Sequence, residues 1–133
     1  MSDLYSEMIL EYYKYPKNKK KLDNADIKYK LNNPLCGDEC EIYVKLDEEK
    51  KVAEEITFDG RGCAISIASA SILTQLTKGK SLLELKEFDK DELLDFIGIK
   101  LSPNRLKCAL LGLETLKAGI KEYLGGNVHF HQE

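Results

Sequence analysis

Three of the four cysteines stand at points where glycine, proline or a helix start punctuates the chain. Cys36 precedes Gly37 in a proline-containing loop, Cys63 follows Gly-Arg-Gly, and Cys108 lies in the first turns of a predicted C-terminal helix. The N-terminus of a helix has unpaired N–H groups and a partial positive charge, and both stabilise a thiolate over a thiol. The thiolate is the form that ligates a metal or attacks sulfur. Because glycine lets the backbone approach a bound group closely, the pattern indicates an accessible thiolate site.

Asp38 adds a carboxylate two residues after Cys36. Three thiolates and one carboxylate make four ligands, the number that tetrahedral Zn²⁺ takes. The same sulfur-rich set suits iron in a [2Fe–2S] cluster. Spacing along the chain does not bring Cys36, Cys63 and Cys108 together, so the residues by themselves predict a thiolate cluster and leave its occupant open.

The remaining candidate ligands have simpler interpretations. Cysteine is often a small buried residue, and Cys40 shares the apolar face of a predicted strand, so we expect it to fill the core. Cys36 and Cys40 have the spacing of half a zinc knuckle, but no second closely spaced pair accompanies them. His129 and His131 have chelating spacing in a polar tail, where solvation is the simpler reading. Lys107 reads as a surface cation of a helix.

The composition is that of an ordinary globular protein. The chain has 133 residues, 43% of them apolar and 32% charged, with a net charge of −3. We expect one domain over residues 1–126 and a flexible tail over 127–133. There is no basic face with interleaved aromatic residues, so nucleic-acid binding is not expected. No apolar run approaches the roughly 20 residues of a membrane helix, and the N-terminus lacks a signal pattern. We therefore expect a cytoplasmic protein that does not bind membranes and whose cysteines are thiols.

The periodicity of apolar residues, together with glycine, proline and capping residues, predicts the helices and strands that position these side chains. Alternating apolar residues predict an antiparallel hairpin, and Gly60-Arg61-Gly62 reads as a sharp break after it. Ser81 and Asp89 are candidate N-caps. The predicted helices cover 3–15, 64–77, one or two short segments within 81–97, and a last helix from Ser102-Pro103 to Gly125-Gly126; the predicted strands cover 26–31, 40–46 and 52–58. This order predicts an α+β fold with helices on one side of an antiparallel sheet.

The last helix should face the core with one stripe of large apolar residues. Positions three or four apart lie on the same face of a helix. The members of this stripe are Leu106, Leu110, Leu113, Leu116, Ile120 and Leu124.

Three segments of the chain resemble one known family. They are residues 31–38 (LNNPLCGD), 60–66 (GRGCAIS) and 105–111 (RLKCALL). In this order they are similar to the iron–sulfur cluster assembly scaffold family, which includes IscU, SufU and the N-terminal domain of NifU. The opening residues up to Pro16-Lys17-Asn18 also look like the first helix of that family, so the resemblance runs from about residue 4 to 124.

The resemblance implies a fold, a site and partners. The fold is a small three-stranded antiparallel sheet packed by helices, with the ligand cysteines at one exposed end. Cys36, Cys63 and Cys108 are the implied ligands, and Asp38 is the implied acidic ligand or release residue. The implied partners are a cysteine desulfurase that delivers persulfide sulfur, with Cys108 or Cys36 as acceptor, and apo iron–sulfur proteins that receive the cluster. The resemblance is also compatible with a homodimer bridged by the cluster.

The chain departs from the family pattern at two places. IscU proteins usually have histidine before the last ligand cysteine, whereas Lys107 stands here, as in SufU. SufU proteins usually carry an insertion between the second and third ligand cysteines, but Cys63 and Cys108 are only 45 positions apart. Residues 101–105 (LSPNR) replace the Leu-Pro-Pro-Val-Lys segment with which IscU binds its chaperone, so we expect no such chaperone.

Two functional hypotheses follow, and a third is disfavoured. In the favoured one the protein is a scaffold that assembles a transient [2Fe–2S] cluster from iron and sulfur. In the alternative it is a zinc-dependent sulfurtransferase of the SufU type. A closed, purely structural zinc domain is disfavoured because glycine flanks the cysteines.

Overall fold

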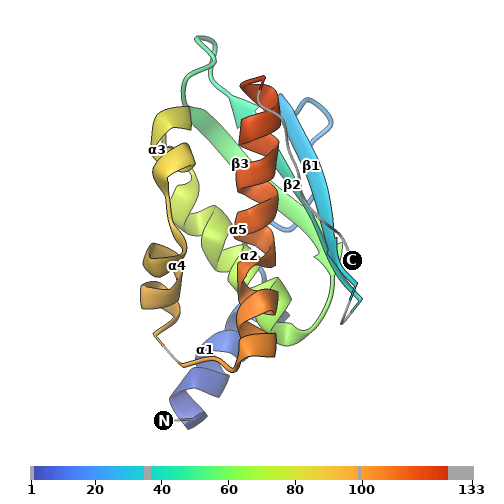
Figure 1. Ribbon diagram of the computed structural model, residues 1–133, viewed down its shortest axis with the longest axis vertical. Helices are drawn as coiled ribbons and strands as arrows, with labels where there is room; N and C mark the ends of the chain where they lie inside the picture. The colour runs from blue at the N-terminus through green and yellow to red at the C-terminus, as the bar shows by residue number, and fades with distance from the viewer. Residues whose placement is uncertain (1, 35–36, 99, 126–133) are drawn as a thin grey trace.

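The computed structural model describes residues 2–34, 37–98 and 100–125. In the described residues, two of the five helices pack on one face of a three-stranded sheet, and the other three pack mainly against those two (Figure 1). The elements in chain order are α1 (Ser2–Lys14), β1 (Ile27–Asn33), β2 (Asp38–Leu46), β3 (Ala53–Arg61), α2 (Ala64–Thr77), α3 (Leu82–Glu87), α4 (Lys90–Ile97) and α5 (Pro103–Tyr123). The predicted α+β architecture is confirmed.

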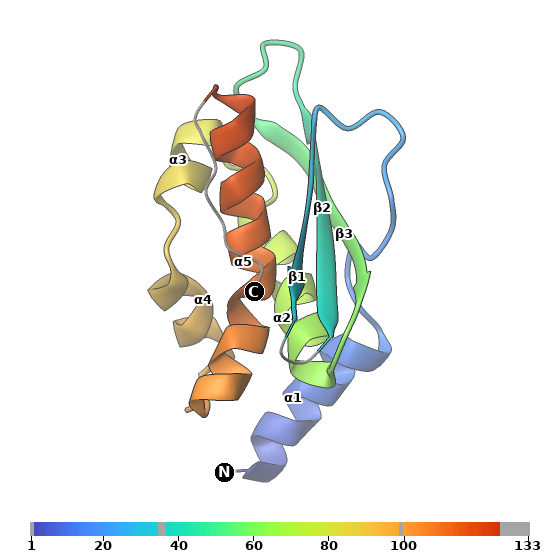
Figure 2. The ribbon, with the colours of Figure 1, turned by 45° about the vertical axis from the view of Figure 1, so that its right-hand side comes forward.

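The sheet is an antiparallel meander in the order β1-β2-β3. Cys40 pairs with Leu31 on one side and with Gly60 on the other. Side chains of a strand alternate between its two faces, and the inward face of β2 carries Asp38, Cys40, Ile42 and Val44, all buried. This register places the start of β2 beside the end of β3, where the chain turns into α2 (Figure 2).

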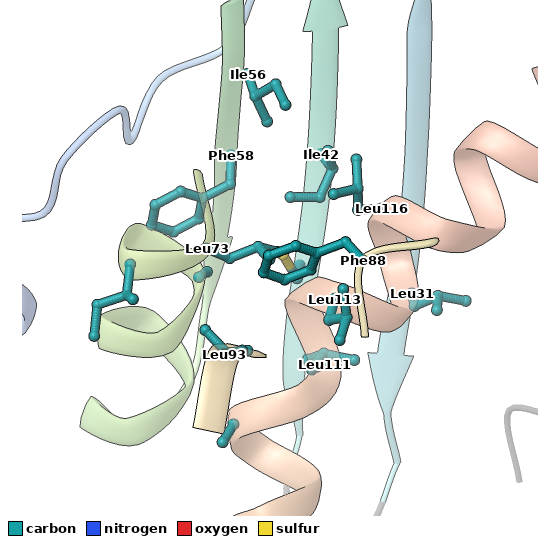
Figure 3. Packing of buried hydrophobic residues seen from close by; sticks show 14 of the residues in the cluster. Leu31, Ile42, Ile56, Phe58, Leu73, Phe88, Leu93, Leu111, Leu113 and Leu116 are labelled. Atoms are coloured by element: carbon teal, nitrogen blue, oxygen red, sulfur yellow. The ribbon is translucent and has the colours of Figure 1, made fainter. Parts of the chain in front are cut away.

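The core lies between the sheet and the helices α2 and α5. Phe58 and Ile42 from the sheet meet Leu73 of α2 and Leu116 of α5, and each is at most 1% exposed (Figure 3). Nearly every position of α2 is buried, as its small and apolar sequence predicts. The two helices thus form a packed layer that carries Cys63 and Cys108 at their N-terminal ends.

The predicted helix starts at Ser81, Asp89 and Ser102 are confirmed. Ser81 and Asp89 are the N-caps of α3 and α4, and each forms a capping box with the glutamate three residues later. Ser102 caps α5 by accepting a hydrogen bond from the N–H of Arg105. These signals depend on residues within one helical turn, so they hold without tertiary information.

Buried polar residues of α2 hold the loop after α1. The N–H of Lys17 donates to Ser71 Oγ, and the Asn18 side chain donates to Thr74 Oγ1 at 3.1 Å. Asn18 has a φ of 60°, a left-handed conformation that asparagine tolerates better than most residues. The segment after α1 is therefore fixed to α2 by hydrogen bonds from Lys17 and Asn18.

Three predicted details were wrong. Strand β2 begins at Asp38 rather than at Cys40, so Asp38 belongs to the sheet and not to a loop. Strand β3 continues through Gly60 to Arg61, because Gly60 still pairs with Cys40, and the break falls after Arg61. Leu124 is 52% exposed because α5 ends at Tyr123, so helical spacing no longer applies to it.

The rest of the predicted stripe of α5 faces inward. Leu113, Leu116 and Ile120 are buried, and Leu106 and Leu110 are half-buried. The proposed tail over 127–133, with His129 and His131, lies outside the described residues. In the described part of the chain no helix is long and apolar enough to cross a membrane.

Candidate metal centre

The first residue of β2 brings a carboxylate to the inward face of the sheet. Asp38 is only 3% exposed and shares its face with Cys40. A buried carboxylate is costly unless hydrogen-bond donors surround it. Such donors come from the segment that follows β3, which lies next to the start of β2.

Cys63 supplies these donors at the start of α2. Its backbone N–H donates to Asp38 Oδ1 at 3.2 Å, and its Sγ lies 3.6 Å from Oδ2. Cys63 is the N-cap residue, but its side chain makes no capping hydrogen bond, and the first turn of α2 holds no acidic residue. Asp38 therefore supplies the negative acceptor that the N-terminus of this helix favours.

Cys108 completes the group from α5. It lies in the second turn of that helix and is 7% exposed. A ligand atom of each of Asp38, Cys63 and Cys108 lies within 4.8 Å of the other two. The view in Figure 2 places the loop from β3 into α2 beside the first turns of α5 at one end of the molecule.

The donor set fits a thiophilic metal. Sulfur ligands of a tetrahedral Zn²⁺ ion sit about 2.3 Å from the metal, which puts them roughly 3.8 Å from one another, so the observed group needs only small side-chain rotations to close on an ion. Two thiols and one carboxylate leave one tetrahedral position for a further ligand. Cys36, the predicted third cysteine, lies outside the described residues.

Access to this group is uneven. Cys63 is exposed, whereas Asp38 and Cys108 are buried. Lys107 is exposed beside Cys108. A reagent or partner would therefore reach Cys63 first, while the other two donors are held by the fold.

Cys40 does not belong to the group. It is 4% exposed in the core, and burial raises the pKa of its thiol to about 12, even though Thr115 offers it a hydrogen bond. A thiol with so high a pKa stays protonated at neutral pH and is a poor ligand. Its place in the core agrees with the prediction that it is a filler.

Sequence reasoning missed how tightly Gly62 lies against this site. Gly62 follows Arg61, which pairs with Glu39, so Gly62 stands opposite Asp38. A Cβ atom added at Gly62 would lie 2.6 Å from Asp38 Cγ. The signal was present in the register of the two strands, but register becomes visible only once the strand ends are known.

Residues 4–129 match the model of the NifU-like N-terminal domain. The chain belongs to this family. It is 37% identical to the zinc-dependent sulfurtransferase SufU of Bacillus subtilis over 144 positions, covering 96% of both chains. It is 35% identical to the iron–sulfur cluster assembly scaffold protein IscU of Aquifex aeolicus over 124 positions, covering 93% of this chain and 78% of the relative.

Solved structures of the NifU-like family share the fold. A crystal structure from Fervidobacterium islandicum AW-1, assigned as a scaffold protein for the SUF system, aligns with a TM-score of 0.70 at 34% identity over 86% of this chain and 95% of its own. The N-terminal NifU-like domain from Brucella abortus aligns with a TM-score of 0.71 at 19% identity, over 92% and 95%. The second likeness concerns the fold alone.

Proposed function

We propose that this NifU-like protein is an iron–sulfur cluster assembly scaffold. It accepts sulfur from a cysteine desulfurase, assembles a transient [2Fe–2S] cluster and transfers it to apo-proteins. The observation that carries the proposal is the convergence of Asp38, Cys63 and Cys108 within 4.8 Å at one end of the molecule. We assign Cys36 as the fourth ligand on the strength of the family resemblance.

Each donor has a distinct part in this proposal. The exposed thiol of Cys63 lies where incoming iron first meets the protein. The oxygen of Asp38 is a hard ligand for iron and exchanges more readily than a thiolate. A cluster held by three thiolates and one such oxygen can be retained during assembly and still be released to a recipient.

Sulfur delivery follows the chemistry of thiol exchange. The thiolate of Cys108 or Cys36 attacks the outer sulfur of the cysteine persulfide on the desulfurase. A new S–S bond forms on the acceptor as the donor's S–S bond breaks, and the desulfurase cysteine leaves as a thiolate. This transfer step needs no oxidant or reductant, because the sulfane sulfur keeps its oxidation state. Its later reduction to the sulfide of the cluster takes two electrons per sulfur, which Fe²⁺ and an added thiol reductant supply.

In aligned length the chain matches the Aquifex aeolicus scaffold protein more closely than the Bacillus subtilis sulfurtransferase. The alignment with the Aquifex aeolicus scaffold protein spans 124 positions and 93% of this chain, which leaves little room for gaps in this chain. The alignment with the Bacillus subtilis sulfurtransferase spans 144 positions, more than the 133 residues present here. That relative therefore carries residues that this chain lacks.

The alternative function is that of a zinc-dependent sulfurtransferase. Two observations favour it: the 37% identity to the Bacillus subtilis protein, and Lys107 in the place where IscU proteins usually have histidine. Bound Zn²⁺ would hold the ligand cysteines as thiolates. In this reading Asp38, Cys63 and Cys108 hold zinc, and Cys108 or Cys36 receives the sulfur.

The partners follow from either function. We propose a cysteine desulfurase as the donor and apo iron–sulfur proteins as recipients, in a cytoplasmic setting that keeps the cysteines reduced. A homodimer that shares one cluster is a further arrangement that an exposed site at one end of the molecule permits.

Anaerobic reconstitution with Fe²⁺, cysteine and a cysteine desulfurase tests the proposal. A scaffold should develop sulfide-to-iron absorption bands in the visible region, and the bands should be lost in Cys63→Ser but kept in Cys40→Ser. Absence of the bands, together with retained zinc and faster desulfurase turnover, would replace the scaffold by the sulfurtransferase.

A further inference from the structure

Gly62 lies closer to the Asp38 side chain than any other residue type would allow. A Cβ at position 62 would be 2.6 Å from Asp38 Cγ, 2.7 Å from Oδ1 and 3.0 Å from its Cβ. Carbon and oxygen atoms in non-bonded contact normally stay more than 3 Å apart. The carboxylate therefore occupies the space that a side chain at position 62 would fill.

Backbone strain does not explain the glycine. Gly62 is not among the glycines with a positive φ, which in the described part of the chain are Gly37, Gly60, Gly79, Gly98 and Gly125. An alanine at position 62 could thus adopt the same backbone conformation. What the alanine could not do is share its place with the carboxylate of Asp38.

The collision would be relieved by moving that carboxylate. The atoms that an added Cβ meets belong to the Asp38 side chain. Aspartate is short, so rotation about its Cα–Cβ bond is its main escape. Such a rotation takes Oδ1 away from the Cys63 N–H and Oδ2 away from the Cys63 Sγ, the two contacts that fix the carboxylate now.

We propose that Gly62 is a positioning residue for the metal centre: its missing side chain lets the carboxylate of Asp38 reach the N-terminus of α2 beside Cys63. This inference rests on the proposed function, because it assigns Gly62 a part in how the site holds its metal. Gly62 touches no metal and acts only through Asp38. The effect of a substitution at Gly62 should consequently vanish when the Asp38 carboxylate is already gone.

The first test needs no metal. In the ¹H–¹⁵N spectrum of the metal-free protein, the amide of Cys63 reports its charge-assisted hydrogen bond to Asp38. Gly62→Ala and Asp38→Ala should both move this amide proton upfield and speed its exchange with solvent. An unchanged Cys63 amide in Gly62→Ala would overturn the inference.

The second test uses Co²⁺ alone as a spectroscopic probe of the ligand set. Gly62→Ala should change the rate of Co²⁺ loss to a chelator in the same direction as Asp38→Ala, by roughly 10-fold, the lower end of the effect of residues that orient metal ligands. The double variant should match Asp38→Ala. A full Gly62→Ala effect on top of Asp38→Ala, or no Co²⁺ binding by the unsubstituted protein, would overturn the inference.

Gly119→Ala is the matched control. A Cβ there would lie 3.0 Å from Ile27 Cγ2 and 3.1 Å from Tyr29 Cβ, so it crowds the packing of α5 on β1 away from the site. It should lower the melting temperature without moving the Cys63 amide or the Co²⁺ spectrum. If it reproduced both effects of Gly62→Ala, general destabilisation would replace the positioning role. Both readouts work without a desulfurase, so failure of cluster assembly would count against the proposed function and not against Gly62.

Discussion

The carboxylate of Asp38 lies across the N-terminus of α2, with Oδ1 3.2 Å from the backbone nitrogen of Cys63 and Oδ2 3.6 Å from its Sγ. A strand residue thus accepts the N–H of the N-cap residue, the group that an N3 glutamate accepts in a capping box. The contact ties β2 to α2 at the point where the metal donors converge. A change at Asp38 therefore affects both the ligand set and the start of the helix that carries Cys63.

Asp38→Ala should make a bound cluster less labile. The substitution removes a hard, exchangeable oxygen ligand and leaves the thiolates. We expect cluster loss to be slower than in the unsubstituted protein. The decay of visible absorption after transfer to air measures it. Asp47→Ala, in the β2–β3 turn, is the control, and faster loss in Asp38→Ala would contradict the assignment.

Cys63→Ser and Cys40→Ser should have opposite profiles. Cys63 is exposed, so its substitution should abolish cluster retention with little change in the free energy of unfolding. Cys40 is buried in the core, and a hydroxyl there should cost about 1 kcal/mol of stability while binding persists. Urea unfolding and reconstitution, run on both variants, give the two readouts. Equal loss of binding in Cys40→Ser would refute the ligand assignment.

Asp89→Ala should destabilise the protein through α4. Asp89 caps this helix by accepting hydrogen bonds from the N–H groups of Asp91 and Glu92. Loss of an N-cap typically costs about 1 kcal/mol, which thermal unfolding detects. Asp91→Ala is the matched control, because Asp91 carries the same charge in the first turn and is likewise exposed, but makes no cap. Equal shifts in the two variants would mean that charge alone matters.

Asp26 should contribute to acid sensitivity. A hydrogen bond from Lys50, followed by one from the Leu46 N–H, lowers the pKa of its carboxyl below the ordinary value. A group with a lowered pKa in the folded state contributes stability that is present above its unfolded pKa, about 3.9, and is lost as pH falls through the folded value. Asp26→Asn should therefore lower stability at pH 7 and flatten its fall below about pH 4. Urea midpoints measured across this range test the prediction, and an unchanged slope would contradict it.

The amino-acid sequence alone predicted most of the helices and strands. Alternation from Cys40 to Leu46 predicted the central strand, the small apolar run from Ala64 predicted a helix buried nearly all round, and Ser81 and Asp89 marked helix starts. Each of these signals depends on neighbours within a few residues. The motifs around Cys63 and Cys108 likewise predicted which side chains could bind a metal.

Only the tertiary structure decided how those side chains meet. The sequence by itself started β2 at residue 40 and ended β3 at residue 58, so the contact between Asp38 and Cys63 and the closeness of Gly62 were not predictable. Both depend on the register of β2 against β3 and on the packing of α5 against α2, which bring residues far apart in the chain within 4.8 Å. Register and packing depend on which strand positions and which helix faces pair with one another. The order of residues along the chain does not by itself specify that pairing.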